Sequence, residues 1–463
     1  MTDGRRGQTV GGAGTPRSDE IGRWVTNARA AIQASQRQVL LVMLGYAVTR
    51  LVLIRELRVD GYVFSPDVSN YHAWALTMVH THHLPTDPSY QYPVGAALLF
   101  LLSNLVPAHF STVFSLLMLG CDLGITLTLT AVAVRAGRFR GVWFWLVLVP
   151  VLGPIVLDRF DLAPTLAVVG ALAVMSPRGR QALFGMLLGA GVLLKVWPVL
   201  GALACGTRQS LARTMAWCVT TVVGVTAISA IFLSNTFGFI SHQSARGLET
   251  ETIVATPWFL REAFTQTAIP VHFPPVGTLE ISGALASDLA SALRAVLFVL
   301  AGGLAVWWFT QTRRGRSVSI ARGRDAVFTA TLWYIIASPV LSPQYMIWLI
   351  GLGAICLCSP ESVMKRPLGV IAVAVLMTRL MLGQVTQLYG GPGTVSLHPT
   401  TGVALLLVAR NVLLLLAAFD AARLLLAPEV RGGRAANGVL SPAEHANGGA
   451  GRERRDQLAT FEG

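Results

Sequence analysis

Runs of apolar residues close to membrane-spanning length recur along this chain from residue 39 to about residue 427. A helix needs about 20 apolar residues to cross the hydrocarbon core of a bilayer, where every backbone polar group must be satisfied within the protein. Of the 463 residues, 53% are hydrophobic and only 13% are charged, against about a quarter charged in a soluble domain. The sequence therefore predicts an all-α, polytopic membrane protein and argues against a soluble enzyme.

The net charge of +13 comes largely from arginines in the two tails and in short connections between apolar runs. These basic connections are residues 135–140, 176–180, 207–213, 312–324 and 364–366. Because Lys and Arg in short loops mark the cytoplasmic side of a membrane protein, this distribution argues against nucleic-acid binding. We expect both termini in the cytoplasm, with a basic tail at 1–37, a membrane domain at 38–427 and a second tail at 428–463. Both tails are Gly- and charge-rich and are expected to be disordered, and the first is not a signal peptide.

Counting spans between the basic connections predicts about 12 transmembrane helices, among them single spans at 111–134, 142–157 and 403–426. The count requires residues 93–106 to lie on the outer side without crossing, because residues 135–140 would otherwise fall outside. That run is also short for a span, so we expect an outer juxtamembrane helix there. The outer face then carries a first loop at 55–110, a hairpin at 158–161 and a long loop at 234–288. Polar hairpins between short helices at one face predict an outward-facing cavity, because irregular backbone at membrane depth must face protein or water.

The five Cys fall in or near apolar runs and show no spacing typical of a disulfide framework or a zinc site. His80, His82 and His83 lie close together, but no acidic or Cys partner stands at a metal-ligand spacing. We therefore expect neither a metal nor a cofactor.

Asp67 is the leading candidate for a catalytic base, because it lies in the first outer loop within the stretch SPDVSNYHAWA. Tyr71 and His72 follow one helical turn later, and Asp60 is the nearest alternative carboxylate. A carboxylate just outside the bilayer could accept a proton from a substrate carried in the membrane. The structural alternative is a helix N-cap, a position that favours Ser, Thr, Asp and Asn.

Charged residues at the outer membrane boundary are candidate ligands for a lipid phosphate. Arg159 and Asp161 flank Phe160 in the short hairpin, where a local ion pair is an equally simple explanation. Lys195 is a lone cation close to Pro198, so it either snorkels to the interface or points into the cavity.

Two further polar positions stand out. The long outer loop contains SHQSARGLETET, which offers His242, Arg246, Glu249 and Glu251, although a solvated loop face would look the same. Asp122 lies in the middle of an apolar run, where it either belongs to a polar path or, as we expect, forms hydrogen bonds between helices.

The order of several short motifs along the chain resembles one known family. The motifs are Asp67 with Tyr71, Tyr92-Pro93 before an apolar helix, Arg159-Phe160-Asp161, Lys195 with Trp197-Pro198, Arg246-Gly247-Leu248-Glu249, and SPQYMIWL at 342–349. Together they are similar to the GT-C superfamily of polyprenyl-phosphate-sugar-dependent glycosyltransferases. The greatest similarity is to glycosyltransferase family 87, which includes actinobacterial mannosyl- and arabinofuranosyltransferases of cell-envelope glycolipids. The resemblance spans residues 39–426 and departs from the family at Val94, where a second proline commonly follows Tyr-Pro.

The resemblance implies a GT-C-like fold in which a first-loop aspartate, here Asp67, acts as general base. It implies an inverting transfer of mannose, another hexose or arabinofuranose from a polyprenyl phosphate to a cell-envelope glycolipid or glycan. The reaction would take place at the outer face of the plasma membrane. Hydrolytic glycosidases use two carboxyl groups, but a polyprenyl phosphate leaves readily as an anion, so one base could suffice. Lys195, Arg159 or Arg246 would stabilise that phosphate electrostatically.

Further candidates for the substrate site are Asp60, Tyr71, His72, Tyr92, Asp161, His242, Glu249, Gln344 and Tyr345. Two other functions remain open from the sequence, a transporter or flippase of lipids or envelope glycans and a non-catalytic membrane scaffold. Transporters often show internal repeats and ion sites at mid-membrane, whereas this chain shows no repeat and gathers its polar residues at one face.

Overall fold

The structure is a computed structural model that describes residues 18–59, 66–175, 180–244, 246–274, 278–313, 317–382 and 395–427. Of the described residues, 77% are helical, and there is little sheet. The described residues up to Leu425 form one compact unit. The site discussed below lies entirely in this unit.

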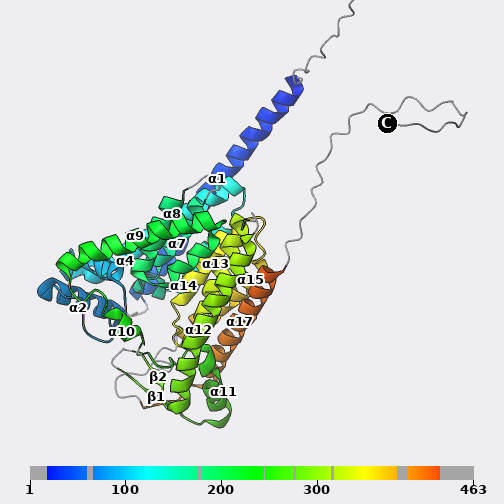
Figure 1. The fold of residues 1–463 in the computed structure, drawn as a ribbon. Coiled ribbons are helices and arrows are strands. Elements are labelled where there is room, and N and C mark those ends of the chain that lie inside the picture. The colour runs from blue at the N-terminus through cyan, green and yellow to red at the C-terminus, as the bar shows by residue number, and fades with distance from the viewer. Residues whose placement is uncertain are drawn as a thin grey trace, which may run out of the picture. The chain divides into compact units, whose positions relative to one another are not determined.

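Helices follow one another from the N-terminus to the loop at 234–288 (Figure 1). Because the sequence predicts that this loop and the loop at 55–110 lie on the outer side, we call them the long outer loop and the first outer loop. The helices are α1 (Ser18–Val59), α2 (Pro66–Thr81), α3 (Val94–Ser103), η1 (Pro107–His109), α4 (Phe110–Ala136), α5 (Arg140–Leu152), α6 (Ile155–Asp158), α7 (Leu162–Val174), α8 (Gln181–Leu194), the 3₁₀-helix η2 (Trp197–Ala204) and α9 (Arg208–Phe232).

The second half contains the long outer loop and the remaining helices. Its elements are α10 (Phe239–Ser244), η3 (Ile253–Ala255), α11 (Thr256–Thr265), β1 (Ile269–His272), β2 (Glu280–Ile281), α12 (Ala284–Gln311), α13 (Ile320–Ile336), α14 (Tyr345–Leu357), α15 (Lys365–Leu382), β3 (Ser396–Leu397) and α17 (Thr401–Leu426).

Among the described residues, five helices are long and apolar enough to cross a membrane, in α1, α4, α9, α12 and α17. Other apolar helices are shorter, and α3 has only 10 residues. At 1.5 Å per residue, α3 is about 15 Å long, roughly half the thickness of the hydrocarbon core. A mostly helical fold with candidate membrane spans and a short helix after Pro93 is therefore confirmed, whereas the total of about 12 crossings stays a prediction.

The expected outer position of the connection between α3 and α4 can be tested by labelling. His109 is exposed just before α4, and Arg135 is exposed in its last turn. We expect His109→Cys to react with a membrane-impermeant thiol reagent added outside, and Arg135→Cys to react only after permeabilisation. Background labelling should be low, because four native cysteines are buried and Cys121 is half-buried. Reaction of His109→Cys only in permeabilised cells would place this connection in the cytoplasm.

Two helices differ from the runs expected from the sequence. Helix α1 begins at Ser18, within the tail that we expected to be disordered, because neither Pro nor Gly interrupts residues 23–44. The single span expected at 142–157 is broken into α5 and α6. The break occurs because Gly153 adopts a positive φ of 89° and Pro154 follows it directly.

Short helices form the buried centre of this compact unit, and the long helices are far more exposed. Helix α14 packs against α5, α7 and α13, while α8 packs against α7 and α9. Only 11% of the apolar window in α9 and 6% of that in α12 is buried. Phe298 of α12, for example, is 81% exposed. Apolar surface on this scale is typical of helices that face lipid, because soluble monomers rarely expose large apolar patches.

Asp122 joins three helices through buried polar contacts. Its carboxylate accepts hydrogen bonds from Nε and Nη2 of Arg50 in α1, at 2.7 and 2.6 Å, and from Nε1 of Trp145 in α5, at 2.9 Å. The side chains of Arg50 and Asp122 are only 3% and 1% exposed. The expected role of Asp122 in bonding between helices is confirmed, and the ion pair neutralises a charge that a bilayer would disfavour.

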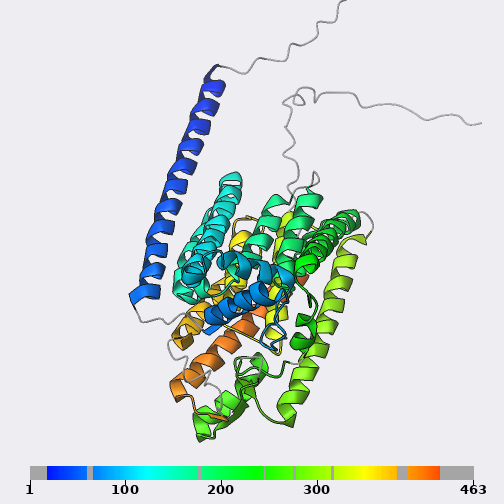
Figure 2. The same ribbon diagram turned by 90° about the vertical axis from the view of Figure 1, so that its left-hand side faces the viewer.

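The long outer loop is folded, and it includes strands that we did not expect. Strand β1 pairs antiparallel with β2 and with β3, in the order β2-β1-β3, and these elements gather with α11 near one end of α12 (Figures 1 and 2). The register places His272 opposite Glu280 and Ile269 opposite Leu397. A second hydrophobic cluster, which includes Phe259, connects this sheet to α12 and α17. The fold is therefore not strictly all-α, because segments far apart in the sequence complete a small sheet.

Candidate active site

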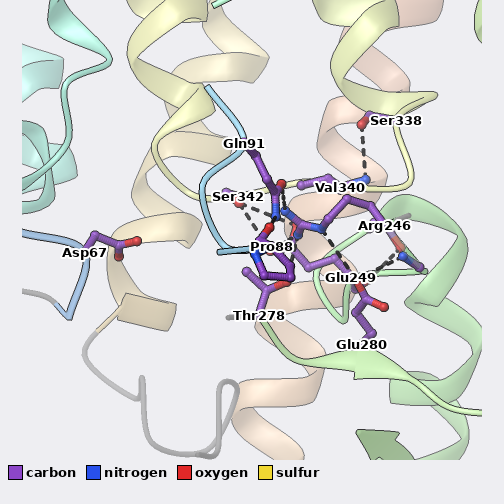
Figure 3. Close-up of polar contacts among 12 residues, drawn as sticks. Asp67, Pro88, Gln91, Arg246, Glu249, Thr278, Glu280, Ser338, Val340 and Ser342 are labelled. Carbon is purple, nitrogen blue, oxygen red and sulfur yellow. Dashed lines mark hydrogen bonds and ion pairs between the residues drawn. The ribbon is translucent and has the colours of Figure 1, made fainter. Parts of the chain in front are cut away.

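Asp67 lies in the first turn of α2, and its carboxylate forms an ion pair with the guanidinium of Arg159. Helix α6 ends at Asp158, so the backbone is already extended at Arg159. The side chains of Asp67 and Arg159 are 26% and 19% exposed, and Figure 3 shows Asp67 apart from the polar network around Arg246. A partly accessible carboxylate of this kind can take a proton from a bound hydroxyl group.

Asp161 of the same hairpin has different partners. Its Oδ1 accepts hydrogen bonds from Nζ of Lys195 and from Nε1 of Trp348, both at 2.7 Å. The Asp161 side chain is 1% exposed and that of Lys195 is 12% exposed. Lys195 is therefore not the lone cation expected from the sequence, because a buried carboxylate balances its charge. Arg159 and Asp161 each pair with a distant residue, so a local ion pair does not explain this hairpin.

Aromatic rings surround the ammonium group of Lys195. Its Nζ lies 4.8 Å from the ring centre of Phe160, 5.1 Å from Trp348, 5.5 Å from Tyr345 and 5.8 Å from Tyr92. Faces of aromatic rings attract cations. The rings also pack on each other, with Tyr345 stacked on Trp348 at 4.2 Å. Four of the short motifs found along the sequence therefore meet around one ammonium group.

Tyr71 and His72 pack against neighbouring rings. The Tyr71 ring is buried, stacks on Phe100 of α3 at 4.5 Å and lies 5.8 Å from the Phe160 ring. The His72 ring stacks on Phe110 at 4.6 Å, and its buried Nε2 has no hydrogen-bond partner within the described residues. Tyr71 thus holds the start of α2 against α3 and against the hairpin that carries Arg159.

Arg246 is the centre of a network that joins the two outer loops (Figure 3). Its guanidinium donates to Oε1 of Gln91 and to Oγ1 of Thr278, both at 2.7 Å. The same guanidinium lies 3.5 Å from Glu280 and 4.0 Å from Glu249. Arg246 is only 8% exposed. Its charge is thus largely balanced by two carboxyl groups, and its contacts mainly order the loops.

Glu249 is buried beside this network. The Ser342 hydroxyl lies 3.3 Å from its Oε1, and its N–H donates to the carbonyl of Pro339 at 3.0 Å. Burial raises the pKa of Glu249 to about 7 against the opposing effect of Arg246, and Glu251 adds to the rise. The Glu249 carboxyl can therefore gain or lose a proton near neutral pH.

Glu249 should make stability depend on pH. A carboxyl group whose pKa is higher in the folded than in the unfolded protein contributes stability that is complete below the unfolded pKa and is lost as pH rises through the folded pKa. For Glu249 the window runs from its ordinary 4.5 to about 7, a difference worth about 3 kcal/mol. Between about pH 5 and about pH 8, we expect the melting temperature of the wild type to fall more than that of Glu249→Gln. Parallel curves for the two proteins would show that another group controls this dependence.

The first outer loop and the long outer loop are held together by hydrogen bonds. The N–H of Leu84 donates to the carbonyl of Ser234 at 3.0 Å. Nδ1 of His242 lies 2.8 Å from the carbonyl oxygen of Tyr90. His242 is thus placed by a backbone contact at the boundary of the site.

Two candidate residues and the question of a metal site remain. Gln344 is buried directly before α14, and its Oε1 has no hydrogen-bond partner in the part of the chain that the structure describes. Asp60 lies outside the described residues. Within those residues, His, Cys, Asp and Glu side chains do not gather in groups of three or more that could hold a metal ion.

A buried ion pair fixes the long outer loop to α17. Nη1 of Arg410 donates to the carboxylate of Glu251 and Nη2 to its main-chain oxygen, both at 2.6 Å. Asn411 adds a hydrogen bond to the carbonyl of Thr252 at 3.1 Å. Arg410 was not among the residues expected from the sequence, although a charge inside an apolar run is itself a signal of function or of a buried partner.

Two other residues of the site had no signal in the sequence. Gln91 and Glu280 both contact Arg246. A Gln and a Glu in loops are each ordinary at their positions. Only the folded loops show that they share one site.

This combination of a partly exposed carboxylate, paired cations and aromatic rings can be compared with known proteins. The model of glycosyltransferase family 87 matches residues 90–343, more than half of the chain. The chain belongs to glycosyltransferase family 87. Membership in family 87 makes this membrane protein a glycosyltransferase, which uses a sugar donor and an acceptor.

The match with family 87 covers Arg159, Lys195 and Arg246, while Asp67 precedes it. No curated protein and no solved structure matches the chain. The family match therefore does not bear on Asp67. The argument for Asp67 as the base in this family 87 member rests on its place in the structure, beside Arg159.

Proposed function

We propose that this family 87 enzyme transfers a sugar, with inversion, from a polyprenyl-phosphate donor to a glycolipid or glycan of the cell envelope. The sugar is mannose, another hexose or arabinofuranose, and the reaction takes place at the outer face of the plasma membrane. The observation that carries the proposal is the ion pair between Asp67 and Arg159, since Arg159 is only two residues before Asp161 of the Asp161–Lys195 pair. A base and a phosphate ligand are thereby available at neighbouring positions.

In the proposed reaction, the acceptor hydroxyl oxygen attacks the anomeric carbon of the donor while the bond from that carbon to the phosphate oxygen breaks. The hydroxyl proton passes to the carboxylate of Asp67, which acts as general base. The bonding electron pair stays with the polyprenyl phosphate, which leaves as an anion. A single displacement from the opposite side inverts the anomeric configuration.

Arg159 is the first choice for the phosphate ligand. Its guanidinium already contacts Asp67, and its buried Nε has no hydrogen-bond partner among the described residues. Guanidinium groups bind phosphates through paired hydrogen bonds. A donor phosphate bound to Arg159 would also weaken its hold on Asp67 and so release the carboxylate for the acceptor.

Lys195 and Arg246 would support the same phosphate from positions fixed by their own partners. The charge of Lys195 is balanced by Asp161, and that of Arg246 by Glu249 and Glu280. Their proposed contribution is electrostatic and at longer range.

Aromatic and polar side chains around these pairs would contact the sugar and the acceptor. Tyr92 and Tyr345 are half-buried beside Lys195, where they would contact the sugar. His72 stacks on Phe110, and His242 contacts the carbonyl oxygen of Tyr90, so both histidines lie next to the first outer loop.

A direct test uses the purified full chain with labelled mannosyl polyprenyl phosphate and candidate glycolipid acceptors. We expect a glycosylated lipid whose new bond has the opposite anomeric configuration to the donor. Nucleotide sugars serve as the control donor and should give no product. A product with retained configuration, or one formed from the nucleotide sugar, would contradict the proposed reaction.

A further inference from the structure

A groove between α15 and α17 has charged residues at one end and apolar side chains along its floor. Its volume is about 710 Å³, and its lining includes Arg366, Gly369 and Val373 of α15 and Leu416, Asp420 and Arg423 of α17. On each helix these residues recur at spacings that place them on one face. Arg410, which holds the outer loop, is about 15–20 Å along α17 from Asp420 and Arg423 at the charged end. The groove is therefore separate from the candidate active site.

Two guanidinium groups meet at the charged end of the groove. The carboxylate of Asp420 lies 3.1 Å from Arg423 and 3.8 Å from Arg366. The arginine side chains are 67% and 75% exposed, whereas that of Asp420 is 18% exposed. Asp420 thus keeps two accessible cations from different helices close together and leaves a net charge of +1. A phosphate group can accept hydrogen bonds from both arginines.

The floor of the groove is open and apolar. Leu416 and Phe419 are 57% and 61% exposed. A Cβ atom added to Gly369 would meet no other atom within 4 Å, so the space above this glycine is empty. An acyl chain would fill such a floor, whereas a soluble phosphate would contact the charged end alone.

The charged end lies where Lys and Arg mark the cytoplasmic side. Arg366 belongs to the basic connection at 364–366, and Arg423 is in the last turn of α17. The cytoplasmic leaflet carries anionic lipids, and basic pockets between helices on that side bind their headgroups. We propose that this groove binds one anionic glycerophospholipid of the cytoplasmic leaflet, with its phosphate between Arg366 and Arg423 and one acyl chain over Gly369.

Native mass spectrometry of the full chain in detergent, with equal amounts of phosphatidylglycerol and phosphatidylcholine, tests the proposal. The wild type should retain phosphatidylglycerol in preference, and the double variant Arg366→Gln, Arg423→Gln should bind it roughly 30-fold more weakly. Gly369→Leu should also lose the lipid, because the new side chain fills the floor while both arginines remain. Arg135→Gln, which removes an exposed arginine elsewhere, is the matched control and should bind as the wild type does.

Soluble glycerophosphate should not displace the lipid. Equal retention of the two lipids, wild-type binding by the double variant, or displacement by glycerophosphate would overturn the proposal. A dimer that forms without lipid and is lost in Gly369→Leu would show that a second copy of the chain occupies the groove.

A measurement that leaves the arginines intact covers the case of a double variant that fails to fold. The Trp333 ring lies 5.2 Å from the Phe419 ring, beside the groove. Phosphatidylglycerol with a brominated acyl chain should quench tryptophan fluorescence less in Trp333→Phe than in the wild type. Identical quenching in both proteins would show that the acyl chain lies elsewhere.

Discussion

Asp67→Asn should lower the rate of sugar transfer about 10²–10⁴-fold, the usual contribution of general base catalysis. Asparagine keeps the size of the side chain and much of its capping ability, but it cannot accept a proton at neutral pH. The ion pair with Arg159 is partly exposed, so its loss should lower stability by no more than about 1 kcal/mol. We therefore expect a folded, inserted protein that binds the donor and transfers almost no sugar, as measured by initial rates and donor binding.

Asp60→Asn is the matched control, because it changes the neighbouring carboxylate of the same outer loop. Its transfer rate should stay close to that of the wild type. If Asp67→Asn is active and Asp60→Asn is not, the base is Asp60. If both variants are active, the reaction does not use a single carboxylate base from this loop.

Arg410→Met should lower the free energy of unfolding by about 3–5 kcal/mol, because it leaves a buried carboxylate without its counter-charge. Arg410 and Glu251 have side chains only 0% and 1% exposed. The substitution also removes the hydrogen bond to the main-chain oxygen of Glu251. Thermal unfolding in detergent should show a large fall in melting temperature. Transfer should fall with it, because Glu251 is two residues from Glu249 in the loop that carries Arg246.

Arg261→Met is the control for Arg410→Met, since Arg261 is an exposed arginine of the same outer loop. It should unfold within a few tenths of a kcal/mol of the wild type, as surface substitutions usually do. The double variant Arg410→Met, Glu251→Met should regain much of the lost stability, because the unpaired charge is gone. An Arg410→Met protein that melts as the wild type does would show that this ion pair does not hold the loop.

The predicted membrane spans agree with the structure wherever the apolar run was long. The runs at 111–134 and 403–426 became α4 and α17, within a few residues. Agreement is poorer where a glycine or a proline ends a helix inside an apolar run. The run at 142–157 looks continuous in composition, yet Gly153 and Pro154 divide it, and this division creates the hairpin that presents Arg159.

The sequence by itself determined the membrane class, the charge pattern and the order of the motifs that place the chain in family 87, because each depends on residue type and spacing alone. Only the tertiary structure decided which charges meet. In the sequence Lys195 is a lone cation in an apolar run. In the structure it is paired with Asp161, 34 residues earlier in the chain. Arg410 and Glu251 are 159 residues apart and still form the best-buried ion pair described here. Such partners cannot be read from local sequence, because desolvation of a charge depends on every element that closes around it, and opposite charges find each other through the fold.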